Sequence, residues 1–262
     1  MPSPLISHNI ASLIYRPAAV WPHPVILYFH HVGRAGTHYT SISLEEFQKA
    51  LDVCESMGRL ATPQCPQSSC KSLRLPILIS FDDGYAETFD SVLPILQDRG
   101  VRAVFFINTA VIGSASFVPS LGRQMRYVNW DVIKEAKSAG HEIGSHGHYH
   151  RNWFDLTPAE VQKEATTSLL SISKNLGAPA WGLAYPYGRP PTKMPHEMKG
   201  LNAFGTIRET AAHWCCAKTR IRRVFLPARE SDCWFKLISE WHRGWLHGAC
   251  AICCDTNDRS PQ

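Results

Sequence analysis

Two adjacent carboxylates stand where a buried strand is predicted to end. They lie in the segment Ser80-Phe-Asp82-Asp83-Gly84, directly behind an apolar run that begins at Ile77. Neighbouring side chains at a strand end point in different directions, so one carboxylate can bind a metal while the other acts as a general base. Gly84 would allow a sharp turn of the backbone. Taken alone, the segment also fits a solvated Asp-Asp-Gly turn.

Three histidines follow further along the chain, at intervals of two residues: His146, His148 and His150. Neutral imidazoles are good zinc ligands, and packing alone rarely gathers three of them. A helical turn would place His146 and His150 on one face and point His148 away, whereas an extended segment would place all three on one side. Gly147 favours the turn. The alternative is a surface loop of solvated histidines.

A third segment, Leu183-Ala-Tyr-Pro186-Tyr187-Gly188, also follows a predicted strand. Its proline and glycine would fix a rigid loop that could hold a backbone N–H toward a site, as an oxyanion hole requires. The alternative for this segment is an ordinary turn with two packed tyrosines.

The elements that must position these residues alternate between strands and helices. Apolar runs predict strands at 25–29, 77–80, 101–107, 141–144 and 181–185. Helices are predicted at 44–57, 86–98, 130–139 and 158–176, and the capping boxes Ser43-Leu-Glu-Glu46 and Thr157-Pro-Ala-Glu160 open the first and the last. Loops are predicted at 61–72 and 190–195, and regular structure again at 223–245. The alternation predicts an α/β fold with a largely parallel sheet, in a single barrel-like domain.

The three segments together resemble the signature of a known family. Ser-Phe-Asp-Asp-Gly, then His-x-x-x-His behind Glu-Ile-Gly-Ser, then Tyr-Pro-Tyr-Gly is similar to the motif set of the polysaccharide deacetylases of carbohydrate esterase family 4, the NodB-homology domain. Asn129-Trp-Asp through Gly140 is similar to that family's helix before the histidine motif. The resemblance covers about residues 25–245 and leaves an N-terminal extension, 1–24, and a C-terminal tail, 246–262. It implies a distorted (β/α) barrel with fewer than eight regular strands and one divalent metal, usually zinc.

By position, the resemblance also implies roles for individual residues. Asp82 matches the catalytic base, and Asp83, His146 and His150 match the metal ligands. Tyr187 matches the residue whose backbone N–H helps to hold the oxyanion.

Two positions depart from the family pattern within these motifs. Gly147 stands where the family usually has Ser or Thr, which removes a hydrogen bond that supports the loop. Ala184 stands where the family usually has an Arg that orients the base. Arg222 or Arg223, just before a strand-like Val-Phe-Leu, is a candidate replacement, and we expect Arg223 to take this role.

The general acid is the third departure. The family's late Leu-x-x-His motif is missing, and Trp245-Leu-His247 imitates it poorly. Near the start, Leu27-Tyr-Phe-His30-His31-Val32 is similar to the Tyr-His-x-Val of permuted family members, in which an N-terminal strand supplies the acid. We therefore expect His30 to be the general acid and His31 to be its outward-facing neighbour.

The expected function is that of a metal-dependent hydrolase that removes N-acetyl groups from a sugar, an oligosaccharide or a glycan precursor. Aromatic side chains near the motifs suggest a saccharide groove, although most are expected in the core: Tyr85, Tyr149, Trp153, Trp181, Tyr185 and Tyr187. Two alternatives stay open. One is hydrolysis of a small amide or ring imide on the same scaffold, and the other is an inactive carbohydrate-binding relative.

Composition excludes several classes of protein. With 44% apolar and 19% charged residues, the 262-residue chain is neither disordered nor a coiled coil. No apolar run approaches the roughly 20 residues of a membrane span. The formal charge of +5 is too weak to indicate a nucleic-acid partner.

Nine cysteines and no visible secretory signal favour reduced thiols and a cytoplasmic location. A true start further upstream would instead allow a secreted or periplasmic protein. Cys250, Cys253 and Cys254 have metal-like spacing, but a four-ligand zinc site would need a second pair, such as Cys215 and Cys216. Ordinary thiols are the preferred interpretation.

Overall fold

The computed structural model describes residues 25–34, 38, 40–63, 75–195, 198, 201–206 and 221–225. The expected N-terminal extension and C-terminal tail lie outside these ranges, as do His247 and every cysteine except Cys54, which is a buried thiol. Within the described ranges, no helix has the length and apolar character that a membrane crossing requires.

The described residues alternate between strands and helices, as the sequence predicts. The strands are β1 (Val25–Phe29), β2 (His31–Gly33), β3 (Ser41–Ser43), β4 (Gly58–Leu60), β5 (Leu75–Phe81), β6 (Val104–Ile107), β7 (Ala115–Val118), β8 (Arg123–Arg126), β9 (Glu142–Ser145), β10 (Leu183–Ala184), β11 (Ala203–Gly205) and β12 (Ile221–Val224). The helices are α2 (Leu44–Met57), α3 (Ala86–Asp98), α4 (Trp130–Ser138) and α5 (Pro158–Leu176), with short 3₁₀ turns η1 (Pro119–Leu121), η2 (Trp153–Asp155) and η3 (Pro186–Gly188).

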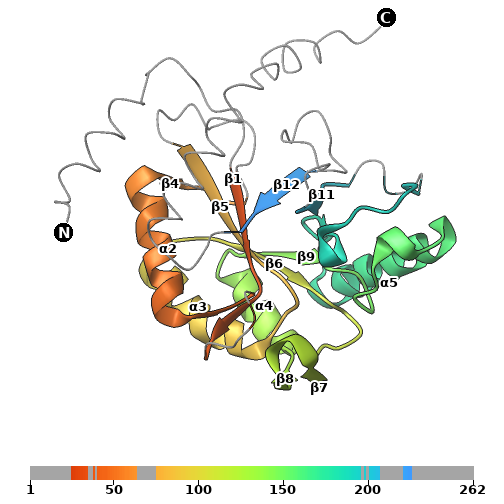
Figure 1. Cartoon of the computed structure of the whole chain (residues 1–262), viewed down its shortest axis with the longest axis horizontal. Coiled ribbons are helices and arrows are strands. Elements are labelled where there is room, and N and C mark those ends of the chain that lie inside the picture. Colours follow the sequence, from red (N-terminus) through yellow and green to blue (C-terminus); the bar gives the residue numbers. More distant parts are fainter. Residues whose placement is uncertain are drawn as a thin grey trace, which may run out of the picture.

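Seven parallel strands form a distorted, nearly closed barrel in a single α/β domain. Their order around the barrel is β1, β12, β11, β10, β9, β6 and β5, and β5 pairs with β1 to bring the two ends of the sheet together. The short strand β4 pairs with β5 in addition. Figure 1 shows β1 between β5 and β12, so that the first and last described strands lie side by side. The expected distorted barrel with fewer than eight regular strands is confirmed.

The helices pack outside the strands and begin where the sequence predicts. Ser43 and Glu46 form the expected capping box of α2, and Thr157 and Glu160 form that of α5. Each cap satisfies backbone N–H groups that have no partner within the helix. In Figure 1, α2 and α3 lie on one side of the barrel and α5 lies on the other.

Some boundaries differ from the prediction. The expected strand 101–107 begins only at Val104, because Gly100 adopts a positive φ and Val101 donates its N–H to the Leu96 carbonyl. The expected strand 181–185 contains only two strand residues before the Pro186 turn. In the expected regular segment 223–245, the structure describes only residues up to 225, where β12 ends at Val224.

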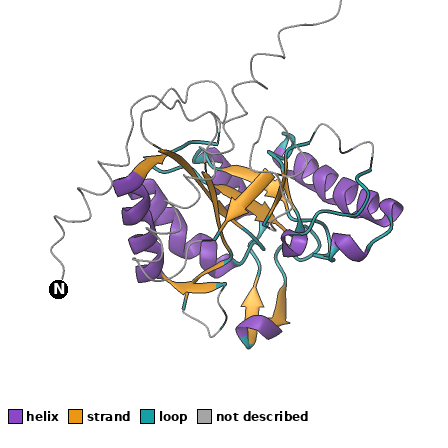
Figure 2. Cartoon of the chain, turned by 45° about the horizontal axis from the view of Figure 1, so that its top comes forward, coloured by secondary structure: helices purple, strands orange, loops and turns teal. Residues whose placement is uncertain are grey.

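The sequence did not predict the antiparallel pair β7–β8. This hairpin projects from the barrel between β6 and α4, as Figures 1 and 2 show. Its strand residues are largely polar or exposed, so they lack the apolar run that marks a buried strand.

Alternate residues of the barrel strands point inward and form one apolar cluster inside the barrel. Its members are Ile26, Leu78, Val104, Phe106, Ala184, Phe204 and Ile221. Gly144 pairs in register with Phe106 and leaves room for it, because a Cβ at position 144 would collide with the Phe106 ring. Continuing the two-residue period toward the carboxyl ends brings His30, Asp82 and His146 to the same end of the barrel.

Candidate metal centre and active site

All of the predicted site residues except Arg223 line one cavity at the carboxyl ends of the barrel strands. The cavity has a volume of about 620 Å³. The residues predicted from the sequence that line it are His30, Asp82, Asp83, His146, His150 and Tyr187. Active sites of parallel α/β proteins usually lie at this end of the strands, because the loops that follow the strands converge there.

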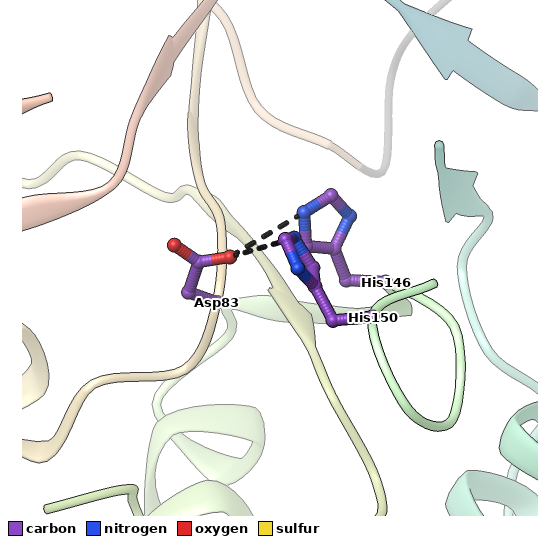
Figure 3. A group of neighbouring side chains, drawn as sticks. All are labelled: Asp83, His146 and His150. Atoms are coloured by element: carbon purple, nitrogen blue, oxygen red, sulfur yellow. Dashed lines mark ion pairs between the residues drawn. The ribbon is translucent and has the colours of Figure 1, made fainter. Parts of the chain in front are cut away.

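Asp83, His146 and His150 converge at the base of the cavity (Figure 3). Asp83 Oδ1 lies 3.5 Å from His146 Nε2 and 3.3 Å from His150 Nε2. One donor atom from each residue lies within 4.8 Å of the others. Both Asp83 and His150 adopt positive φ values, 70° and 55°, which turn their side chains toward this point. Such strained backbone conformations cluster at functional sites.

A hydrogen bond determines which ring nitrogen of His146 carries the proton and which is free to bind a metal. Its Nδ1 lies 2.8 Å from the carbonyl oxygen of Ala184, which can only accept, so Nδ1 carries the proton and Nε2 presents a lone pair to Asp83. Burial lowers the pKa of His146 to about 4, so the ring is neutral at neutral pH. A second hydrogen bond of this kind orients most metal-binding histidines.

The three residues fit a divalent cation. Asp83 Oδ1 is buried and has no hydrogen-bond partner, although such an oxygen normally has one. It faces the lone pair of a neutral imidazole, which cannot donate to it. Two imidazole nitrogens and one carboxylate oxygen form a common ligand set for zinc and similar metals.

A bend in the backbone brings the two histidines together. The prediction that His146 and His150 converge and that His148 points away is correct, but the segment is not helical, since Gly147 adopts a φ of 82°. His148 Nδ1 instead contacts Thr109 Oγ1 at 2.9 Å. The imidazoles at positions 146 and 150 therefore meet across a loop rather than along one face of a helix.

Glu164 replaces the support that the loop was expected to lack at Gly147. One of its carboxylate oxygens, Oε2, accepts the backbone N–H groups of His148 at 3.0 Å and Tyr149 at 2.9 Å. Ser145 Oγ also accepts the N–H of Gly147 at 3.1 Å. The sequence-based interpretation missed Glu164, although a buried acid on the apolar face of α5, one turn from Val161 and Ser168, was a visible signal.

Asp82 is paired with Arg223, the predicted replacement for the arginine missing at Ala184. Arg223 donates from Nη1 to Asp82 Oδ1 at 2.6 Å and from Nη2 to Oδ2 at 2.7 Å. The guanidinium is fully buried between the rings of Tyr28 and Phe106, 5.1 Å from each centroid. This two-point contact fixes the plane of the carboxylate. The structure does not describe the side chain of the other candidate, Arg222.

The charge of Asp82 follows from this pairing. Burial by itself would raise the pKa of Asp82, but the charge and hydrogen bonds of Arg223, together with the nearby His146 and His30, outweigh it and lower the pKa to about 2. The carboxylate is therefore ionised throughout the neutral range. Its Oδ2 also lies 3.9 Å from His146 Nε2, so it borders the metal centre without belonging to the three converging residues.

His30 reaches the other side of Asp82 from the end of β1. Its Nε2 lies 4.0 Å from Asp82 Oδ2, and its Nδ1 is buried without a hydrogen-bond partner. The ring packs edge-on against Tyr28 at 5.5 Å. The structure thus brings His30 into the site. His31 is not an outward-facing neighbour: it is fully buried and contacts Ser41 Oγ and Arg123 Nη2.

Tyr187 lies at the rim of the cavity in the turn η3. Its φ is 58°, its side chain is 61% exposed, and its ring lies 4.8 Å from that of His150. The loop is fixed against β11 because Thr206 donates its N–H to the Gly188 carbonyl at 3.0 Å. The other predicted aromatics divide: Trp153 and Tyr185 are buried in the core, whereas Tyr149 is exposed and lines the cavity.

Comparisons with known proteins agree with this geometry. The family model described as polysaccharide deacetylase matches residues 72–203. The chain is 29% identical over 113 residues to the Bacillus subtilis (strain 168) protein YxkH, a match that covers 43% of this chain and 37% of YxkH. It is 28% identical over 109 residues to a chitin deacetylase from Pestalotiopsis sp, covering 42% of this chain and 33% of that enzyme. Each match spans only about a third of the relative's length.

Two solved structures share the fold. IcaB from Ammonifex degensii superposes with a TM-score of 0.65 at 20% identity, covering 82% of this chain and 97% of that one. The Streptococcus pyogenes deacetylase PplD, in complex with acetate, gives a TM-score of 0.66 at 17% identity, with the same coverage of both chains. Since the family match extends over half of the sequence and includes the Asp82–Asp83 and histidine segments, this chain belongs to the polysaccharide deacetylase family.

Proposed function

We propose that this chain is a metal-dependent hydrolase that removes N-acetyl groups from a saccharide or glycan precursor. One observation carries the proposal: an ionised Asp82, oriented by Arg223, stands between the Asp83–His146–His150 cluster and His30. Amide hydrolysis needs a base on the water side and an acid on the nitrogen side. Asp82 is the candidate for the base, and His30, 4.0 Å from it on the side away from the metal cluster, is the candidate for the acid.

Asp83, His146 and His150 would hold the metal, and we propose zinc. Such an ion lowers the pKa of a water molecule and polarises a carbonyl oxygen when it is bound. Neighbouring protein groups would position these ligands. The hydrogen bond from His146 Nδ1 to Ala184 keeps Nε2 available, and Glu164 keeps the loop that carries both histidines in place.

Asp82 would take a proton from the attacking water as the new C–O bond forms. The pairing with Arg223 keeps this carboxylate ionised and aimed, because both of its oxygens are held by the guanidinium. The N–H of Tyr187 would donate to the oxyanion, which is the role implied by the family motif.

His30 would protonate the amide nitrogen as the C–N bond breaks, giving acetate and a free amine. An amide anion is too poor a leaving group to depart without this proton. The proton held by Asp82 would return to His30 once the two side chains approach to hydrogen-bond distance from the 4.0 Å that separates His30 Nε2 and Asp82 Oδ2 in this structure. We further propose the permuted arrangement, in which the first strand of the barrel supplies the acid.

The proposal is tested by acetate release from N-acetylglucosamine and its β-1,4-linked oligomers. The protein is assayed as purified, after treatment with a chelator, and after zinc is added back. Release that the chelator abolishes and zinc restores is the expected result. Restoration by another divalent ion alone would contradict the assignment of zinc.

Other outcomes would overturn the deacetylase proposal itself. Hydrolysis of small amides or imides without release from any sugar would favour the small-amide alternative. Retention of one metal per chain without hydrolysis of any substrate would favour an inactive binding relative. Failure to bind any metal would contradict the ligand assignment.

A further inference from the structure

Exposed aromatic side chains gather around the active-site cavity. Among the described residues, six large apolar side chains are exposed: Leu44, Phe117, Tyr149, Phe154, Leu170 and Tyr187. Three of them, Phe117, Tyr149 and Tyr187, line the cavity that contains Asp82 and His30. They are 61%, 66% and 61% exposed. Large apolar groups that are concentrated at the rim of one cavity mark a binding surface.

Phe117 comes from the hairpin β7–β8, which no sequence motif indicated. Along β7, Val118 packs inward with Leu121 and Met125 against Tyr85, forming a small core of the hairpin. Because strand residues alternate between faces, the preceding residue, Phe117, points to the opposite face. Its exposure therefore follows from the way in which the rest of the hairpin is packed.

The hairpin is tied to both sides of the active site. At its base, Val128 donates its N–H to the carbonyl of Gly84, the residue after Asp83, at 2.9 Å. On β8, Arg123 Nη2 contacts His31 Nε2 at 2.9 Å and Glu87 Oε2 at 3.1 Å. His31 follows His30 directly. Phe117 is thus held at a fixed place relative to the proposed base and the proposed acid.

Two exposed tyrosines, Tyr149 and Tyr187, line the same cavity. Glu164 holds the backbone of Tyr149, and the Tyr187 ring packs against His150. The cavity between the hairpin and these tyrosines, at about 620 Å³, is within the range that accommodates drug-sized ligands rather than a single small group. Thr40 and Asn108 also line it and can hydrogen-bond to hydroxyl groups.

We propose that Phe117 is a specificity-determining residue that stacks on a second sugar ring, next to the ring that carries the reacting acetamide. Sugar rings present C–H faces that pack on aromatic planes, while their hydroxyls require polar partners at the edges of the same cavity. This inference rests on the proposed function. The preferred substrate then contains at least two linked sugar rings.

The test measures binding and turnover for N-acetylglucosamine and for its β-1,4-linked tetramer, with zinc-loaded full-length protein. The variants are Phe117→Ala and Phe117→Trp, with Leu170→Ala as a control that is equally exposed but lies outside the cavity. Binding is measured by calorimetry in an Asp82→Asn background, so that turnover cannot distort it.

Loss of one stacking contact should weaken the binding of the tetramer roughly five- to tenfold in Phe117→Ala. Binding of the monomer should change little, and Phe117→Trp should retain the affinity of the parent protein for the tetramer. In the active background, the KM for the tetramer should rise while kcat stays within about twofold of the parent value.

The possible failures are distinguishable. Equal effects of Phe117→Ala on monomer and tetramer, or no effect on either, would overturn the role of Phe117 even if acetate is released. If no acetate is released but the affinity for the tetramer still depends on Phe117, the proposed hydrolysis is wrong, and the proposed stacking of a sugar ring on Phe117 is supported.

Discussion

The middle of the chain and its two ends contribute to the site in different ways. Residues 82–188 supply Asp82, Asp83 and the two histidines from the loops that directly follow the barrel strands β5 and β9, which lie on either side of β6. The ends supply one residue each, His30 after β1 and Arg223 on β12. These two residues are almost two hundred positions apart in sequence, yet both contact Asp82 from adjacent strands.

In this barrel, some site residues lie in short sequence motifs, and others become neighbours only through the pairing of strands that are far apart in the sequence. Each ligand of the candidate metal centre lies in a short sequence motif, and the motifs taken together indicate the site. The partners of Asp82 become neighbours only because β1 lies between β5 and β12. Loss of a metal ligand in the middle of the chain should therefore remove the metal, whereas loss of His30 or Arg223 at the ends should leave the metal bound and impair turnover.

The largest effect is expected for His146→Ala. Loss of a buried ligand should abolish both metal binding and acetate release, because only two ligands remain. Metal content per chain and turnover should be measured together. His148→Ala is the matched control, since His148 lies in the same loop but contacts Thr109 instead. A His146 variant that keeps one metal per chain would show that the ligand set is wrong.

Asp82→Asn should distinguish loss of the catalytic base from loss of the metal. The amide keeps the shape of the side chain but cannot take a proton, so turnover should fall by roughly 10²–10⁴-fold while metal content stays at the parent level. Retained turnover would eliminate Asp82 as the base, and a loss of metal would make it a ligand instead.

Arg223→Lys should have a smaller effect at the same carboxylate. A lysine retains the charge but cannot form the two parallel hydrogen bonds, so kcat should fall by about 10–100-fold with metal content unchanged. Arg99→Lys, which alters a pair with Asp52 on the surface, is the control and should keep full activity. Unchanged turnover in the Arg223 variant would remove its role in orienting the base.

The smallest effect is expected at Gly147. Its φ of 82° is unfavourable for a side chain, so Gly147→Ala should lower the free energy of unfolding by about 1–2 kcal/mol. A Cβ there would lie 3.5 Å from Trp153 Nε1, a buried donor without a partner. Gly147→Ser should therefore be less destabilising than Gly147→Ala, because its hydroxyl can accept from the indole. Denaturant unfolding of both variants measures this, and the reverse order would contradict the proposed contact.

The sequence predicted the barrel because its strands and helices depend on local signals, whereas the assignment of Asp83, His146 and His150 as metal ligands came from the resemblance of three motifs taken together. Apolar runs marked β1 and β5, capping boxes marked α2 and α5, and the motif residues stood directly behind strands. The expectation of a replacement arginine came from the resemblance, in which Ala184 stands in place of the usual Arg, whereas the two hydrogen bonds from Arg223 to Asp82 depend on the folded chain.

The features that the sequence did not reveal depend on tertiary contacts. Glu164 supports a loop sixteen residues before it, and no residue of the loop indicates that Glu164 is its partner. His31 was expected to face outward, but its ring is buried because Ser41 and Arg123 satisfy both nitrogens. The same arginine holds the hairpin β7–β8 against His31 and Glu87. The position of the hairpin therefore depends on contacts between distant parts of the chain, which the sequence alone does not show.

The central claim is that the first strand completes the site by supplying the acid. It is tested most directly by the ratio of kcat/KM for an N-acetylated sugar to that for an activated acetate ester, measured in His30→Ala and in the parent protein. An ester with a good leaving group needs no proton on departure. The account predicts that amide hydrolysis falls by roughly 10²–10⁴-fold, while ester hydrolysis and metal content change far less. An equal loss for both substrates, or full amide activity without His30, would contradict it.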